Sequence, residues 1–314
     1  MTRHARVRAL AKINLDLRVL GKRPDGFHEL RTIFQTISLA DTIDVAFTSA
    51  RRTAIVLDDP LAIPDNLIAR AAQLTLDAMR LNGRVEMRLT KRIPMGAGLG
   101  GGSSDAAAIL LALPVLAGRR LPLRILTDIA AQLGSDVPYF LLGGTAAGIG
   151  RGTELFPLAD VAPQPGLLLA PGIHIDTKKA YQDLSPRLTT DLQRNKMVSF
   201  QTLTWDTCGL AGVGNDFEEV VFEQHPELAA IKRRLVRAGA TTALMTGSGS
   251  AVFGLFPDRN AVQRAMELVK RSAKGTQSFQ ISLVSRVRYR SMWRRALAEH
   301  IEPRTWPPQS RYSR

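Results

Sequence analysis

The stretch that most constrains this chain is Pro94-Met-Gly-Ala-Gly-Leu-Gly-Gly-Gly-Ser-Ser104, which holds five glycines in residues 96–102. Glycine loses more backbone entropy than any other residue when it enters a helix or strand. This density is therefore typical of a loop that needs positive φ angles or that lets a ligand touch the main chain. A tight loop with close packing of small residues is the alternative interpretation of the glycines alone.

The residues after this loop favour the start of a helix. Ser103, Ser104 and Asp105 are good N-cap residues, and the apolar, alanine-rich run 105–113 follows them. We expect this helix to end before Pro114. A helix start carries free N–H groups and about half a positive charge, so a glycine loop that leads into one is suited to bind phosphate.

Three common phosphate loops do not fit the sequence. A Walker A loop requires Gly-Lys-Ser/Thr, and no lysine follows Gly102. The dinucleotide fingerprint G-x-G-x-x-G is matched by residues 96–101, but residues 119–123 lack the acid that would hold a ribose. A protein-kinase loop requires H-R-D and D-F-G strings, and the chain has neither.

The whole string 94–104 resembles the phosphate loop of the GHMP small-molecule kinases, the family of galactokinase, homoserine kinase and mevalonate kinase. Further strings are similar to the branch of that family that acts on 4-diphosphocytidyl-2-C-methyl-D-erythritol. They are Ala11-Lys-Ile-Asn-Leu15, Arg23-Pro-Asp-Gly-Phe-His-Glu-Leu30, Gly134-Ser-Asp-Val-Pro-Tyr-Phe140 and the second glycine-rich signature at 243–256. The resemblance covers roughly residues 6–284.

The resemblance implies an α+β, two-domain GHMP kinase fold with the active site in the cleft between the domains. We expect an N-terminal, ATP-binding β-α domain, similar to a ribosomal-protein domain, over residues 1–160. A ferredoxin-like C-terminal domain is expected over 161–287. Residues 288–314 match no part of the family, and we expect a helix over 292–300 followed by a disordered basic tail.

The resemblance also implies a mechanism of phosphoryl transfer. Asp136 is expected to take the proton from the acceptor hydroxyl, while Lys12 holds Asp136 ionised and stabilises the transferring group. ATP is the implied phosphoryl donor, and Mg²⁺ is expected to bridge its phosphates near Ser104 with ligands that the sequence does not fix. The implied product is the 2-phosphate of the acceptor, an intermediate of non-mevalonate isoprenoid and terpenoid biosynthesis, known as the MEP pathway.

The binding residues implied by the resemblance form two sets. The expected nucleotide contacts are Asn66, Leu67, Lys91, Pro94, Met95, Gly96, Ala97, Gly98, Leu99, Gly100, Gly101, Gly102, Ser103, Ser104, Gly247 and Ser248. The expected acceptor contacts are Asn14, Phe27, His28, Asp136, Thr177 and Tyr181. Phe27 and Tyr181 are expected to sandwich the cytosine ring, with His28 reading its hydrogen-bonding edge.

Composition sets the remaining expectations. The chain of 314 residues has a formal charge of +14, and residues 285–314 hold eight arginines and two glutamates. A basic balance favours anionic partners, either nucleotides or nucleic acid. The single cysteine, Cys208, and the lack of an apolar run of membrane-spanning length predict a cytoplasmic protein. We expect the protein to be a monomer or a homodimer.

Two other functions remain open at this stage. One is a GHMP kinase with another small alcohol acceptor, such as homoserine or a sugar, although those acceptors have no base to stack on Phe27 and Tyr181. The other is a basic nucleic-acid-binding protein of similar fold, which the charge and the arginine-rich end favour. This function leaves the combination of Lys12, Asp136 and two glycine loops unexplained.

Overall fold

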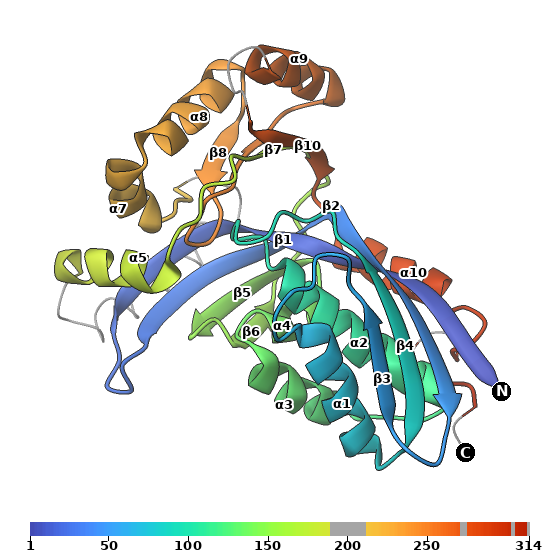
Figure 1. Cartoon of the computed structure of the whole chain (residues 1–314). Coiled ribbons are helices and arrows are strands. Elements are labelled where there is room, and N and C mark those ends of the chain that lie inside the picture. Colours follow the sequence, from blue (N-terminus) through green and yellow to red (C-terminus); the bar gives the residue numbers. More distant parts are fainter. Residues whose placement is uncertain (189–211, 271–274, 303–304, 313–314) are drawn as a thin grey trace.

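Figure 1 shows the computed structural model of the chain, which describes residues 1–188, 212–270, 275–302 and 305–312. Residues 190–206, whose polar sequence predicts a loop with short helices, and Cys208 lie outside the described residues. Within the described residues, no helix combines the length and the apolar character that crossing a membrane requires.

A long β-hairpin is the central element of the fold. Its two strands are β1 (Thr2–Lys22) and β2 (His28–Ser49), which pair antiparallel along their whole length. The alternation of apolar residues over 13–19 predicted a strand there, and this is confirmed, although β1 extends much further in both directions. In Figure 1 the hairpin arches across the molecule, and the two lobes lie on either side of it.

The first lobe is a mixed sheet with helices on one face (Figure 1). One edge of β2 pairs with β1, while the other pairs with β5 at residues 30–35 and with β4 at residues 42–49. The remaining strands are β3 (Ala54–Asp58), β4 (Gly83–Thr90), β5 (Thr145–Gly150) and β6 (Glu154–Pro157). The covering helices are α1 (Leu67–Met79), α2 (Gly101–Ala117), α3 (Leu123–Leu133) and α4 (Val137–Leu142).

The second lobe has the ferredoxin-like arrangement that the family resemblance implied. Its four strands have the order β10-β7-β9-β8, and each neighbouring pair is antiparallel. This order results from two split β-α-β units. The strands are β7 (Pro165–Ala170), β8 (Thr242–Met245), β9 (Val252–Leu255) and β10 (Gln277–Ser282). The helices are α5 (Thr177–Leu184), α7 (Phe217–Gln224), α8 (Pro226–Arg237) and α9 (Arg259–Lys270), with a short 3₁₀ turn at Ser185–Arg187.

Buried apolar residues form three clusters that explain how the lobes join. One lies between the first sheet and its helices, and a second lies between the second sheet and its helices. The third joins the middle of the hairpin to the second sheet through residues such as Ile13, Ile37, Leu168 and Phe253, all fully buried. Burial of apolar area is the main favourable term in folding, so this third cluster fixes the second lobe on the hairpin.

Helix α2 extends beyond its expected end. We expected it to stop before Pro114, but the helix continues through this proline to Ala117. Proline removes one main-chain hydrogen bond from a helix interior. Here the helix is buried along almost its whole length. It ends three residues after the proline, at Ala117, and is followed by Gly118, whose positive φ of 74° is suited to a helix C-terminus.

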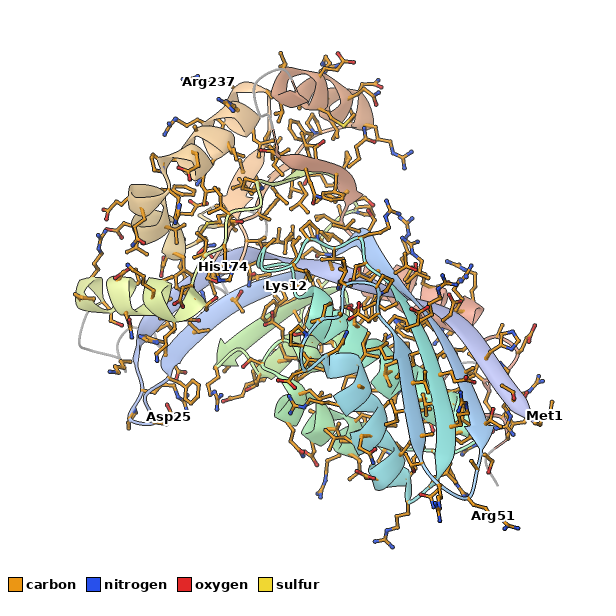
Figure 2. The ribbon with its side chains drawn as sticks, viewed as in Figure 1. Met1, Lys12, Asp25, Arg51, His174 and Arg237 are labelled. Carbon is orange, nitrogen blue, oxygen red and sulfur yellow. The ribbon has the colours of Figure 1, made fainter. Side chains whose placement is uncertain are left out.

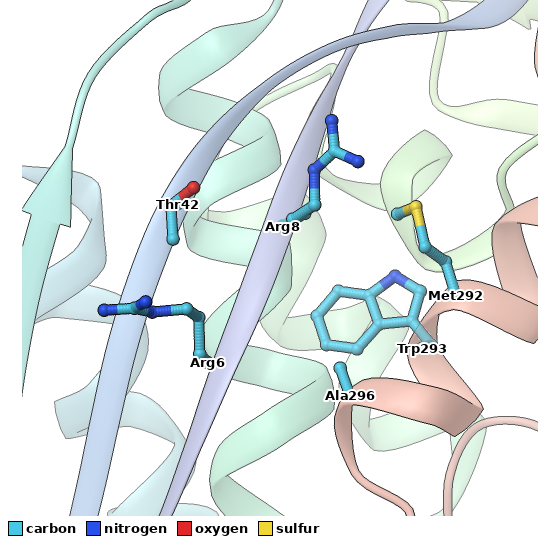
Figure 3. Close-up of a pocket in the computed structure, with 6 residues that line it drawn as sticks. All are labelled: Arg6, Arg8, Thr42, Met292, Trp293 and Ala296. Carbon is cyan, nitrogen blue, oxygen red and sulfur yellow. The ribbon is translucent and has the colours of Figure 1, made fainter.

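The prediction of a disordered tail is wrong for the described residues after position 288. Helix α10 (Arg286–Ala296) begins earlier than expected, capped by Ser285, and packs beside β1 (Figure 3). Tyr289 and Trp293 are buried in the core of the first lobe. Further on, the Trp306 indole N–H donates to the Leu141 carbonyl over 3.0 Å. The chain therefore returns to the first lobe after leaving the second.

Arginines of this segment act in packing. The Arg286 guanidinium donates to the main-chain carbonyls of Gly143, Thr145 and Leu158. The Arg290 guanidinium lies 5.1 Å from the centre of the Trp306 ring. These two arginines have structural partners, so their presence does not require a nucleic-acid ligand.

Truncation of Tyr289 tests whether the C-terminal segment belongs to the folded core. The ring is buried, and its hydroxyl donates to the Phe140 carbonyl over 2.6 Å. Tyr289→Ala should lower the free energy of unfolding by about 3–5 kcal/mol, because it leaves a cavity. Tyr289→Phe keeps the ring and should lower it by less. Urea denaturation measures both, and an unchanged midpoint for Tyr289→Ala would show that the segment is not part of the core.

Candidate active site

The glycine loop meets the second glycine turn, and main chain packs directly on main chain. Gly98 has a φ of 76°, and a Cβ atom there would lie 2.2 Å from the Thr246 carbonyl oxygen. A Cβ on Gly247 would lie 3.2 Å from the Gly98 Cα atom. Glycine is therefore required in both turns for steric reasons, and the two lobes touch at this point.

Helix α2 begins earlier than its sequence suggests. Its N-cap is Gly100, in the left-handed region with a φ of 66°, rather than one of the polar residues 103–105. No side chain caps this helix start. Its first N–H groups therefore remain available to an anion, as in other phosphate-binding helix starts.

A cavity of about 380 Å³ lies between the glycine loop and the start of α1. Of the expected nucleotide contacts, it is lined by Asn66, Leu67, Lys91, Pro94, Met95, Gly96, Ala97, Gly98, Leu99, Gly100, Gly101, Gly102 and Ser103. Ser104 does not line it, because its buried hydroxyl donates to the Leu10 carbonyl over 2.7 Å. The Asn66 amide is also engaged, since it caps α1 through the Ile68 N–H and donates to Asp59.

Lys91 enters this cavity with its charge already paired. Its Nζ lies 2.5 Å from Asp41 Oδ2 and 2.8 Å from Asp105 Oδ2. Both carboxylates are buried, and Asp105 Oδ1 has no hydrogen-bond partner among the described residues. Burial, together with the charge of Asp41, raises the pKa of the Asp105 carboxyl to about 7, although Lys91 opposes the shift. Asp105 also lines the cavity, although it was not among the expected nucleotide contacts.

A second cavity, of about 330 Å³, shares Gly96, Gly98 and Gly100 with the first. Its lining includes the expected residues Lys12, Asn14, Asp136, Thr177, Tyr181, Gly247 and Ser248. Gly247 and Ser248 were expected at the nucleotide, and the structure places them here instead. Figure 2 shows Lys12 where the two lobes meet, with His174, which also lines this cavity, close by in the view.

Lys12 and Asp136 come together where the cavities meet. Lys12 Nζ lies 3.5 Å from Asp136 Oδ2, and the lysine is buried while the aspartate side chain is one-third exposed. Asp136 precedes α4, whose first turn contains Pro138, and its side chain makes no capping hydrogen bond. The start of α4 therefore does not hold the carboxylate, which lies beside Lys12 and lines the second cavity.

The side chain of Asn14 connects Lys12 to the second glycine turn. Its Oδ1 accepts from Lys12 Nζ over 2.8 Å and from the Gly247 N–H over 3.0 Å. Its Nδ2 donates to Thr32 over 2.7 Å. Asn14 was expected to bind the acceptor, but these bonds occupy both ends of its amide, so in this structure it holds the other groups of the site in place.

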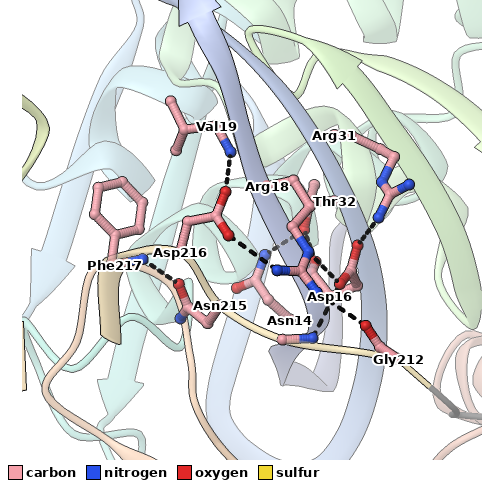
Figure 4. A network of polar contacts seen from close by, with 11 residues as sticks. Asn14, Asp16, Arg18, Val19, Arg31, Thr32, Gly212, Asn215, Asp216 and Phe217 are labelled. Atoms are coloured by element: carbon pink, nitrogen blue, oxygen red, sulfur yellow. Dashed lines mark hydrogen bonds and ion pairs between the residues drawn. The ribbon is translucent and has the colours of Figure 1, made fainter. Parts of the chain in front are cut away.

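A buried polar network locks the segment 212–217 against β1 (Figure 4). Asp16 is 2% exposed and accepts from Arg31 over 2.6 Å, from Arg18 over 3.1 Å and from the Gly214 N–H over 3.0 Å. Asp216 accepts from Arg18 over 3.0 Å and from the Val19 N–H over 2.8 Å. The network adds the segment to the edge of the hairpin.

The same segment also fixes the second glycine turn. The Asn215 amide donates to the carbonyls of Met245 and Gly247, each over 2.8 Å. The Thr177 and Ser248 hydroxyls are 2.8 Å apart, which joins the start of α5 to this turn. Thr177 and Ser248 therefore satisfy each other in this structure.

The aromatic residues expected around a cytosine ring are arranged differently from the expectation. Phe27 is 48% exposed and lines neither cavity; the Arg151 guanidinium lies 3.5 Å from its ring centre. The rings of His28 and Tyr181 are stacked 4.7 Å apart, and Phe217 meets Tyr181 edge-on. Phe27 and Tyr181, the rings expected to sandwich cytosine, thus each have one face covered by a side chain of the protein itself.

Local surroundings shift the pKa values of this aromatic group. Burial, with a smaller contribution from Lys22, lowers the pKa of the His28 imidazole, whose Nε2 lies 2.8 Å from the Ser185 hydroxyl. Burial and the nearby Asp136 carboxylate raise the pKa of the Tyr181 hydroxyl. Tyr181 is therefore neutral, and Asp136 is close enough to influence it.

Sequence reasoning missed His174 and Arg151, which both line the second cavity. Arg151 stands in the glycine-rich segment 143–152. Its position between Gly150 and Gly152 is a usable signal for a turn that presents a side chain. His174 has no comparable local pattern. Its position depends on how the start of α5 faces the glycine loop.

Comparison with known proteins relates this geometry to a family. The GHMP kinase N-terminal domain matches residues 66–144, and the GHMP kinase C-terminal domain matches residues 203–274. The 4-diphosphocytidyl-2-C-methyl-D-erythritol kinase of Solibacter usitatus (strain Ellin6076) is 69% identical over 316 residues, which cover 99% of both chains.

The chain belongs to the 4-diphosphocytidyl-2-C-methyl-D-erythritol kinases of the GHMP kinase family. The enzyme of that name from Geobacter sulfurreducens is 38% identical over 84% of this chain and 94% of its own length. A crystal structure of 4-(cytidine 5'-diphospho)-2C-methyl-D-erythritol kinase matches 90% of this chain with a TM-score of 0.73 and 37% identity. Homoserine kinase from Cytophaga hutchinsonii has a TM-score of 0.67 at 19% identity, which shows a common fold alone.

The raised pKa of Asp105 predicts a pH dependence of stability in this GHMP kinase. The folded state holds the proton more tightly than the unfolded chain, so stability falls as the pH rises from 3.8, the ordinary pKa of an aspartate, towards about 7. Asp105→Asn removes this titration. Between pH 5 and pH 8 the wild type should lose about 2–3 kcal/mol more unfolding free energy than the variant. Denaturation with a chelator present measures both, and equal losses would contradict the assignment.

Proposed function

We propose that the chain transfers the γ-phosphoryl group of ATP to the 2-hydroxyl of 4-diphosphocytidyl-2-C-methyl-D-erythritol. The product is the 2-phosphate, formed in non-mevalonate isoprenoid precursor biosynthesis. The relative that is 69% identical over the full length carries the name of this enzyme. The observation that carries the proposal is the Lys12–Asp136 pair, 3.5 Å apart, where a cavity beside the glycine loop meets a second one.

Phosphoryl transfer requires positioning and neutralisation of charge more than covalent catalysis. We assign the triphosphate to the loop 94–104, whose glycines bring main-chain N–H groups to the start of α2. The adenosine would occupy the cavity lined by Asn66 and Leu67. The acceptor hydroxyl would then lie on the other side of the shared glycines, beside Asp136.

Asp136 is the proposed general base, because its carboxylate faces the second cavity and makes no capping hydrogen bond. General-base catalysis typically contributes about 10²–10⁴-fold to a rate. The Lys12 ammonium, 3.5 Å away, stabilises the ionised carboxylate and the negative charge that develops on the transferring group. Its bond to Asn14 holds the ammonium at this position.

The cytosine end of the acceptor is assigned to Phe27, His28 and Tyr181. Aromatic faces bind a flat base through stacking, and an imidazole can read its edge. A buried donor or acceptor left unpaired by the wrong base lowers affinity, which gives discrimination between cytosine and uracil. Binding between the two aromatic rings requires His28 to leave Tyr181 and Arg151 to leave Phe27, because both faces are covered without a ligand.

Mg²⁺ is the proposed metal cofactor, and the residues present fit it. Within the described residues no cluster of three or more His, Cys, Asp or Glu side chains could hold a metal ion. This fits Mg²⁺, which is usually held by one or two carboxylates together with substrate phosphates and water. Asp105, whose Oδ1 lacks a hydrogen-bond partner among the described residues, would supply such an oxygen at the nucleotide cavity. The bound ion would neutralise phosphate charge.

The cytoplasm is the proposed location, because ATP and small nucleotide-linked alcohols are the proposed ligands. Nucleic acid is not a proposed ligand, since Arg286 and Arg290 of the basic C-terminal segment make structural contacts. The expectation of a monomer or a homodimer stays a prediction.

An ATP-consumption assay with four candidate acceptors tests the proposed function. Turnover should appear with 4-diphosphocytidyl-2-C-methyl-D-erythritol and remain at background with mevalonate, homoserine and galactose, which have no base to stack on Tyr181. Faster turnover with any of the other three would identify a GHMP kinase with another acceptor and reject the proposed substrate.

Replacement of Asp136 tests the assignment of the base. Asp136→Ala should lower kcat about a hundredfold or more, while ATP still binds, because the loop 94–104 is unchanged. Asp136→Asn, which keeps the size of the side chain but cannot accept the proton, should be impaired to a similar extent. Single-turnover rates and ATP-binding titrations measure the two effects. Near-normal turnover in either variant would remove Asp136 from this role.

A further inference from the structure

Arg151 has no role in the account so far, although it lines the second cavity. We propose that Arg151 is a substrate-binding residue that recognises the diphosphate of the acceptor. The inference rests on the proposed function, because it assumes an acceptor in which a diphosphate joins cytidine to a small alcohol.

The main chain around Arg151 is shaped to present its side chain. The residue stands in the turn between β5 and β6, flanked by Gly150 and Gly152, which have φ angles of 68° and 85°. The φ of Gly150 lies in the left-handed region, which residues with a side chain rarely adopt, so this position favours glycine. Positive φ on both sides of one residue makes a tight and well-defined turn.

The Arg151 charge is not neutralised by an ion pair within the described part of the chain. Its guanidinium stacks 3.5 Å from the centre of the Phe27 ring. Asp25 is close enough for its pKa to be lowered slightly by Arg151, but burial, the Phe27 N–H and Arg23 affect it more strongly. Asp25 already pairs with Arg23 over 3.1 Å. The guanidinium thus retains its hydrogen-bond donors for a ligand.

The position of Arg151 matches the position that the diphosphate must occupy. The acceptor hydroxyl is assigned to Asp136 and the cytosine to the rings of Phe27 and Tyr181. Because the diphosphate joins these two ends, it has to pass through the part of the cavity between them. Arg151 lines this cavity and also touches Phe27, so it links the two regions.

The chemistry of arginine suits this ligand. A guanidinium offers donors in a planar fork that can bind phosphate oxygens with two parallel hydrogen bonds. Lys12, the other cation assigned to the acceptor, already donates to Asn14 and lies beside Asp136. When cytosine takes the Phe27 face, Arg151 is released from the ring and reaches the diphosphate.

Calorimetric binding of cytidine and cytidine diphosphate separates this role from a structural one. Arg151→Ala should weaken binding of cytidine diphosphate about tenfold or more, the loss expected for a charge-assisted hydrogen bond. Binding of cytidine, which has no phosphate, should not weaken, because the loss of Arg151 only uncovers the Phe27 ring. Arg151→Lys keeps the charge and should recover part of the affinity. Arg124→Ala, an arginine whose side chain is 87% exposed on α3, controls for the loss of one positive charge.

Steady-state kinetics gives an independent readout of the same role. The KM for the acceptor should rise in Arg151→Ala, while kcat and the KM for ATP stay near the wild-type values. Equal weakening of cytidine and cytidine diphosphate would show that Arg151 only supports Phe27, and would overturn the proposal. Unchanged binding of both ligands would overturn it as well. A wild-type protein that binds neither ligand would instead reject the proposed function, and this inference with it.

Discussion

The hydrogen bonds of the Asn14 amide are the interaction on which the site depends. They join Lys12 to the Gly247 turn and to Thr32. A single side chain of the central hairpin therefore holds both the proposed catalytic cation, Lys12, and the glycine turn of the second lobe. The two neutral bonds, to Thr32 and Gly247, each stabilise a fold by only about 0.5–1.5 kcal/mol, and a bond from a charged donor such as Lys12 by about 1.5–3 kcal/mol. Their larger effect is geometric, because a shift of about 1 Å in a catalytic group can lower a rate strongly.

The steric demands of main-chain contact explain why the glycines are where they are. Gly98, which lines both cavities, packs directly against Gly247, which lines the second. The apolar cluster around Ile13 and Phe253 holds the lobes together behind this contact. Apolar packing thus provides the stability of the junction, while the glycines and Asn14 determine its shape.

The sequence predicted those parts of the site whose chemistry is local. The composition of the glycine loop is typical of a phosphate site, and the strings around Lys12 and Asp136 indicated, through family resemblance, two residues that the structure brings within 3.5 Å. Roles that depend on distant partners could not be predicted. The partner of Lys91 at Asp41 lies 50 positions away in the sequence. The order of the C-terminal segment, similarly, depends on contacts such as the one between Trp306 and Leu141. Local composition indicated unpaired charge and disorder in this segment, but its tertiary contacts order it.

A double-mutant cycle on Lys12 and Asn14 tests the central claim most directly. Single-turnover phosphoryl transfer is measured for the wild type, Lys12→Ala, Asn14→Ala and the double variant, with thermal unfolding to verify that each folds. If Asn14 acts by holding the ammonium, its removal should slow the wild type strongly and the Lys12→Ala variant much less, so the two losses are not additive. Losses that add in the logarithm of the rate would show that the two residues act independently, which would contradict this account.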